Sequence, residues 1–201
     1  KPGTVIDMQD YWLEVEGTLL ADNSTIMSSI QTTSPGSHNA GVWDSLTITS
    51  TGTAVLDNVT ISNAKSCIIV EGILTATGLI LEDCLIGIEI DGTATISDLS
   101  SSHIDHDGVR VTGDAEISSA TFTDMSGGIH SSGDLILTGG EFTDVGTGLS
   151  LTGGTADVEA LNYNSGVGNG VSISSGVSGD VDGMTGHSTN AIVSMDSSGF
   201  S

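Results

Sequence analysis

Two histidines and two aspartates lie close together in the sequence, at His103, Asp105, His106 and Asp107. Imidazole nitrogens and carboxylate oxygens are common metal ligands, so this segment is a candidate metal site. Its spacing matches no known zinc motif. A solvated turn between two strands is the alternative explanation of the same residues.

Arg110 follows this segment and is the only arginine of the 201-residue chain. The chain has 3 Lys and Arg residues against 26 Asp and Glu residues, and its formal net charge is −23. Nucleic acids and anionic lipid surfaces are recognised by clustered cations, so both are excluded as partners. No apolar run is long enough to insert into a membrane. Such an acidic chain is typical of marine or halophilic prokaryotes, including archaeal surface proteins, because salt screens its self-repulsion.

A glycine recurs along the chain, each time at the end of a short segment in which apolar and polar residues alternate. Successive spacings are 20, 20, 21, 20 and 20 residues for Gly52, Gly72, Gly92, Gly113, Gly133 and Gly153. Between these glycines apolar and polar residues alternate, which predicts short strands with one buried face. A unit of this size cannot bury its own apolar face and must stack on copies of itself. The register predicts one inward column made of Leu56, Ala76, Ile96, Ile117, Leu137 and Val158.

The repeat resembles the right-handed parallel β-helix of the pectin-lyase-like superfamily, and the resemblance covers approximately residues 3–201. The resemblance depends on the sequence pattern of the repeat unit, and no catalytic motif contributes to it. The predicted fold is all-β: a right-handed, single-stranded parallel β-helix with coils of about 20 residues. We expect a single domain over residues 1–201, with an excursion loop at 32–40. The chain is interpreted as a piece of a longer protein, whose neighbouring domains are expected partners.

Small polar residues share one turn position in successive units, at Asn63, Asp83, Asp124 and Asp144. In register they would stack as a ladder, because Asn and Asp bond neighbouring backbone amides and tolerate unusual dihedral angles. Stacked carboxylates repel one another unless a proton or a cation lies between them. A bound divalent cation such as calcium is therefore the alternative to a purely structural ladder.

A second outward column contains Glu89, Arg110 and His130, with Asp91 two residues beyond Glu89. The resemblance implies a catalytic reading, because polysaccharide lyases of this fold use an Arg or Lys base beside acidic residues that hold calcium near a uronate carboxylate. The alternative is a cross-strand ion pair between Arg110 and Glu89. Neither explanation is decided by the sequence.

Two further features bear on the cellular environment. Cys67 and Cys84 fall at different phases of adjacent units, so we expect no disulfide between them and interpret Cys84 as a small core residue. Asn23 and Asn58 begin N-x-Ser/Thr sequons, which are glycan acceptors in an exported protein. Together with the solenoid repeat and the acidity, the sequons predict an extracellular or cell-surface location.

The leading functional hypothesis is a non-catalytic stalk, adhesion or binding module of a large surface protein, in contact with a polysaccharide, a cell-surface glycan or calcium. A fragment of a polysaccharide lyase or glycoside hydrolase is the alternative. The units from 53 to 153 lack the long loops that wall a catalytic cleft, which favours the stalk. Threonine pairs such as Thr75 and Thr77 suggest a remote third hypothesis, an ice-binding face, but the column breaks at Glu116.

Overall fold

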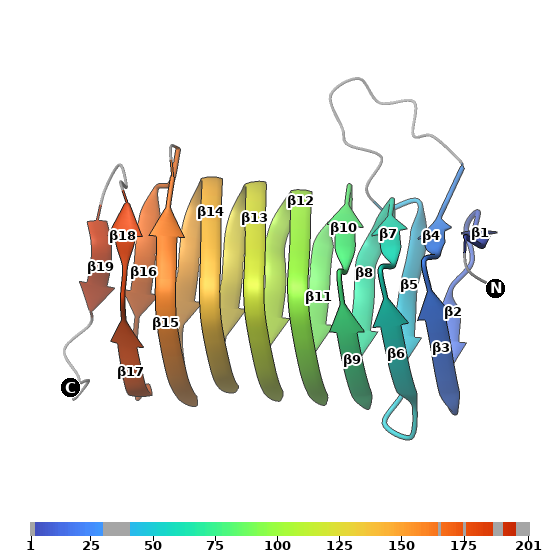
Figure 1. The fold of residues 1–201 in the computed structure, drawn as a ribbon, viewed down its shortest axis with the longest axis horizontal. Helices are drawn as coiled ribbons and strands as arrows, with labels where there is room; N and C mark the ends of the chain where they lie inside the picture. Colours follow the sequence, from blue (N-terminus) through green and yellow to red (C-terminus); the bar gives the residue numbers. More distant parts are fainter. Residues whose placement is uncertain (1–2, 30–40, 165, 175, 187–190, 196–201) are drawn as a thin grey trace.

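The computed structural model describes residues 3–29, 41–164, 166–174, 176–186 and 191–195. These residues form an all-β parallel solenoid of about eight coils, each of roughly 21 residues, with no helix (Figure 1). The predicted fold class is therefore confirmed. The predicted excursion at 32–40 lies outside the described residues.

Each coil contributes a strand to three stacked faces. The first face contains β3 (Thr18–Asp22), β6 (Thr53–Asp57), β9 (Ile73–Thr77), β17 (Ser178–Asp182) and the first part of β15 (Thr155–Tyr163), which continues into the second face. The second face contains β1 (Val5–Asp7), β4 (Thr25–Met27), β7 (Thr60–Ser62), β10 (Ile80–Glu82) and β18 (Thr185–Gly186). The third face contains β2 (Leu13–Val15), β5 (Trp43–Ile48), β8 (Ala64–Val70), β11 (Ile86–Ile90), β16 (Asn169–Ile173) and β19 (Ala191–Met195). Three long strands, β12 (Thr93–Val111), β13 (Asp114–Ser131) and β14 (Asp134–Leu151), run through all three faces.

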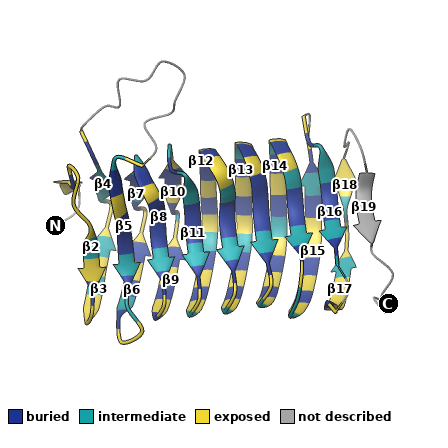
Figure 2. Cartoon of the chain, turned by 180° about the vertical axis from the view of Figure 1, so that it is seen from behind, coloured by how far each residue is buried: buried dark blue, intermediate teal, exposed yellow. Residues whose placement is uncertain are grey.

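The predicted inward column is confirmed in full. Parallel pairing joins Leu56 to Ala76, and Ala76 to Ile96, in adjacent coils. The same register continues through Ile117, Leu137 and Val158, and all six side chains are buried. Buried and exposed residues therefore alternate along strands such as β6 and β9, and bands of the two kinds are visible in Figure 2. One continuous apolar core runs along the solenoid axis.

Aromatic rings extend this core in the later coils. The rings of Phe122 and Phe142 stack with centroids 5.1 Å apart, and Phe142 stacks on Tyr163 at the same 5.1 Å distance. Burial raises the pKa of the Tyr163 hydroxyl, because the phenolate would lose its hydration. The stack runs through three consecutive coils because the register holds these aromatic positions above one another.

Most of the repeating glycines mark a corner where the backbones of consecutive coils approach closely. A Cβ atom added at Gly92 would lie 2.2 Å from the carbonyl oxygen of Gly72. Gly72 itself faces the carbonyl oxygen of Gly52 in the same way, at 2.3 Å. The sequence period thus reflects a contact between backbones that leaves no space for a side chain.

Replacing Gly92 by Ala should destabilise the protein by about 1–3 kcal/mol, because the methyl group forces the two coils apart. Gly17 is the matched control, since it holds the equivalent position of the first coil and its added Cβ meets no atom within 4 Å. Urea unfolding of both variants measures the difference. Equal midpoints for Gly92→Ala and Gly17→Ala would contradict the close contact.

Two exposed carboxylates also link adjacent coils. Asp134 accepts hydrogen bonds from the backbone nitrogen of Thr155 at 2.9 Å and from its hydroxyl at 2.6 Å. Asp7 accepts bonds from Ser29 in the same manner. The hydroxyl and amide donors lower the pKa of both carboxyl groups. Both contributions to stability are present above the ordinary carboxyl pKa and are lost as the pH falls through the lowered pKa.

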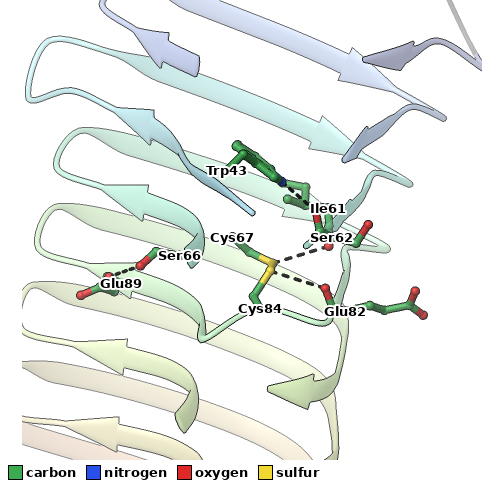
Figure 3. The surroundings of a disulfide bond; sticks show 8 residues. All are labelled: Trp43, Ile61, Ser62, Ser66, Cys67, Glu82, Cys84 and Glu89. Atoms are coloured by element: carbon green, nitrogen blue, oxygen red, sulfur yellow. Dashed lines mark hydrogen bonds between the residues drawn. A yellow bond between two sulfur atoms is a disulfide. The ribbon is translucent and has the colours of Figure 1, made fainter. Parts of the chain in front are cut away.

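A disulfide joins Cys67 to Cys84, so the expectation of unpaired cysteines was wrong. Figure 3 shows the two side chains meeting from consecutive coils, and their Cα atoms are 5.9 Å apart. Cys67 belongs to β8 on the third face, whereas Cys84 follows β10, the second-face strand of the next coil. Side chains that point inward from either side of a corner approach one another. Alignment of the repeat units compares positions within each unit, and it does not show that two different positions can meet across a corner.

Loss of the disulfide should lower the free energy of unfolding by about 3 kcal/mol, the value expected for a crosslink that closes a loop of this size. Cys67→Ala/Cys84→Ala and the dithiothreitol-reduced wild type should both unfold at lower urea concentration. The reduced protein keeps both sulfur atoms and so controls for lost packing. Two titratable thiols in the native, unreduced protein would contradict the pairing.

Candidate functional site

The outward column predicted for the third face is confirmed. Parallel register joins Glu89 to Arg110, and Arg110 to His130. It continues from His130 to Ser150 and then to Ser172. Strands of neighbouring coils lie about 4.8 Å apart, so these side chains form a row along the solenoid axis.

Arg110 pairs with Asp107 rather than with Glu89. Its Nε atom lies 2.7 Å from Oδ2 of Asp107, and both side chains are partly buried, at 38% and 23% exposure. Residues three apart in a regular strand point to opposite faces. Here Gly108 and Val109 are both buried, so the alternation is broken and Asp107 lies on the same side of the strand as Arg110. The predicted Arg110–Glu89 ion pair is therefore corrected to Arg110–Asp107.

The two acidic residues predicted to accompany Arg110 contact hydroxyl groups of neighbouring coils. Glu89 accepts a hydrogen bond from the hydroxyl of Ser66 at 2.5 Å. Asp91 accepts a hydrogen bond from the hydroxyl of Thr112. Both carboxylates therefore link neighbouring coils through hydrogen bonds. The charged partner of Arg110 is Asp107, a residue of the same strand.

A shallow groove of about 290 Å³ surrounds Arg110 on the third face, and we call it the Arg110 groove. It is lined by His106, Asp107, Arg110, Ser126, Gly127, His130, Thr147, Ser150, Asn169 and Ser172. The chain has 3 Lys and Arg residues and 5 His residues, and three of these eight side chains line the groove. A guanidinium, two imidazoles, several hydroxyls and one amide can donate hydrogen bonds there.

His103 occupies the turn column between two of the predicted ladder aspartates. Its Nδ1 atom lies 3.9 Å from Oδ1 of Asp83, and its Nε2 atom lies 3.8 Å from Oδ2 of Asp124. His103, Asp83, Asp124 and Asp144 all have positive φ angles, between 53° and 57°, at one corner of the solenoid. The carboxylates therefore do not form one continuous ladder, because an imidazole separates Asp83 from Asp124.

The candidate metal segment is divided between two surfaces. His103 lies at the corner column, whereas His106 and Asp107 line the Arg110 groove. Asp105 borders the corner, where its backbone carbonyl accepts a bond from Ser126. Among the described residues, no three His, Cys, Asp or Glu side chains are grouped so that they could hold a metal ion.

Both predicted glycan acceptors are exposed at another corner, with positive φ angles of 45° at Asn23 and 51° at Asn58. The amide of Asn58 donates to the adjacent Asp57 at 2.9 Å. On the first face the threonine row is interrupted, since Thr75 pairs with Val55 and Thr95 pairs with Glu116. The regular hydroxyl array of an ice-binding face is therefore broken at both ends.

The sequence identified Arg110 and His130 but missed Asp107 as the ion partner, and it missed Ser126 and Asn169 as part of the groove. Asp107 was named only as a candidate metal ligand, because strict alternation along a strand would place it on the opposite side from Arg110. Ser126 and Asn169 carry no signal that separates them from many other polar residues.

Comparison with protein-family models, curated proteins and solved structures gives no match to this chain. Within the part of the chain that the structure describes, no helix has the length and apolarity to cross a membrane.

Proposed function

We propose that this chain is a non-catalytic module of an extracellular surface protein, a stalk that contacts a polysaccharide or cell-surface glycan through the Arg110 groove. A fold of the pectin-lyase-like kind, used for binding without catalysis, fits this role. The observation that carries the proposal is the 2.7 Å contact between Arg110 and Asp107 beside an open groove rich in hydrogen-bond donors.

The disulfide supports an extracellular location. Disulfides form and persist in oxidising compartments and are rare in reducing ones. The exposed Asn23 and Asn58 sequons agree with export by a cell that glycosylates. The net charge of −23 suits a saline exterior, where salt screens repulsion.

The regular stack of coils supports a stalk. From β6 to β14 the described coils pass from strand to strand through short corners, and the solenoid is elongated along its axis (Figure 1). A catalytic β-helix would need long loops to wall its cleft. Here the groove is lined by residues of the strands and of the short corners between them.

The charge state of Arg110 favours binding over catalysis. A lyase base must be unprotonated when it takes a proton from the sugar. Asp107 at 2.7 Å stabilises the guanidinium cation, which is the wrong form for a base and the right form for a carboxylate or sulfate group. The hydroxyls of Ser150 and Ser172, next in the row, can meet the neutral hydroxyls of the same sugar chain.

Calorimetric titration with uronate oligosaccharides tests the proposal. Binding should weaken with salt, and Arg110→Gln should lower the affinity about tenfold, because a charged hydrogen bond is lost. Lys65→Gln is the matched control, since it removes a cation that lies outside the groove and pairs with Asp44 at 3.7 Å. Its affinity should match the wild type.

The enzyme alternative makes a different prediction in the same samples. Ultraviolet absorbance from unsaturated products would contradict the stalk proposal and support a lyase, if it requires added calcium and is lost in Arg110→Gln. Absence of binding to both uronate and sulfated oligosaccharides would refute the glycan contact.

A further inference from the structure

The two exposed aromatic side chains of the described residues are adjacent, at the N-terminal end of the third face. Tyr11 is 64% exposed and Trp12 is 63% exposed. The second tryptophan, Trp43, is only 1% exposed, and its indole donates to the carbonyl of Ser62 at 2.8 Å. Trp12 thus leaves an indole ring in water, although burial of such a ring is strongly favourable.

Trp12 borders a shallow hollow of about 340 Å³, which we call the Trp12 hollow. The other lining residues are Glu14, Asp44, Ser45 and Thr47. They come from β2 and β5, the first two strands of this face, which pair in parallel. The hollow therefore combines one aromatic ring with two carboxylates and two hydroxyls.

The polar groups of the hollow are better suited to a cation than to a neutral sugar. Both carboxylates only accept hydrogen bonds. The hydroxyls of Ser45 and Thr47 lie 2.7 Å apart and are bonded to each other. A neutral sugar needs donors as well as acceptors, and this site is poor in free donors. The face of an indole ring is negative and attracts cations, tryptophan more strongly than other aromatic residues.

One carboxylate of the hollow already contacts a cation of this chain. The ammonium group of Lys65 is 3.7 Å from the carboxylate of Asp44, with both side chains exposed at 68% and 61%. Lys65 is one of only 3 Lys and Arg residues in a chain with 26 acidic residues. An ammonium group therefore already contacts one carboxylate of the site, whereas Glu14 and the indole ring remain available to another.

We propose that the Trp12 hollow binds an organic cation through a methylated ammonium group, which packs on the Trp12 ring between Glu14 and Asp44. Methyl groups make the cation weakly hydrated and let it contact the ring, and the carboxylates balance its charge. This site is separate from the Arg110 groove and does not depend on the glycan contact.

Tetramethylammonium is the probe, and the two indole N–H signals in a nitrogen-15 NMR spectrum are the readout. Addition of the probe should shift the Trp12 signal in a saturable manner and leave the buried Trp43 signal in place. Potassium at equal ionic strength controls for charge alone, and tert-butanol controls for apolar contact alone. Neither should reproduce the shift.

Variants locate the site. Glu14→Gln and Asp44→Asn should each weaken the affinity, read from the Trp12 signal. Trp12→Leu should lower it about fivefold or more, read from the backbone amide of Thr47. Tyr11→Leu is the matched control, because Tyr11 is equally exposed but does not line the hollow, and its affinity should be unchanged.

Several results would overturn the proposal: an equal shift with potassium or tert-butanol, a shift with neutral sugars in place of the cation, or unchanged affinity in Trp12→Leu. A concentration-dependent shift without any probe would instead indicate contact between copies of the chain.

Discussion

The structure depends on one constraint: each coil must lie on the next in parallel register, because a single coil has no interior of its own. Two contacts fix that register at once. Inward side chains such as Ile96 and Ile117 pack directly on their equivalents in the next coil. At the glycine corner, backbones such as those of Gly72 and Gly92 approach too closely for any side chain. A shift of one residue would expose the apolar row and place side chains at that corner.

The same register makes the surface functional. Outward positions repeat every coil, so unlike residues at one position form a row along the solenoid axis. On the third face this row places Arg110 between Glu89 and His130 and surrounds it with donors from later coils. Partial burial strengthens the Arg110–Asp107 contact relative to a fully exposed pair, because less water screens it. The scaffold repeats from coil to coil, and the chemistry of this row lies at Glu89, Arg110 and His130, after which the row continues as Ser150 and Ser172.

The repeat period of the sequence was sufficient to predict the fold, the inward column and the outward row, because all three follow directly from the length of a coil. It was not sufficient for contacts that depend on the local shape of the corners. The Cys67–Cys84 disulfide spans a corner, and Asp107 reaches Arg110 because the two residues between them are both buried. His103 was assigned to a metal segment, although the register places it between Asp83 and Asp124. Local backbone irregularity leaves no periodic signal, so these contacts required the structure.

Methyl–methyl nuclear Overhauser effects test the register most directly, since every row on the surface depends on it. With isoleucine, leucine and valine methyl groups labelled, the account predicts consecutive contacts from Ile96 to Ile117, from Ile117 to Leu137 and from Leu137 to Val158. Absence of these contacts, or contacts between α-hydrogens that are typical of antiparallel strands, would contradict the stacked parallel coils and the faces built on them.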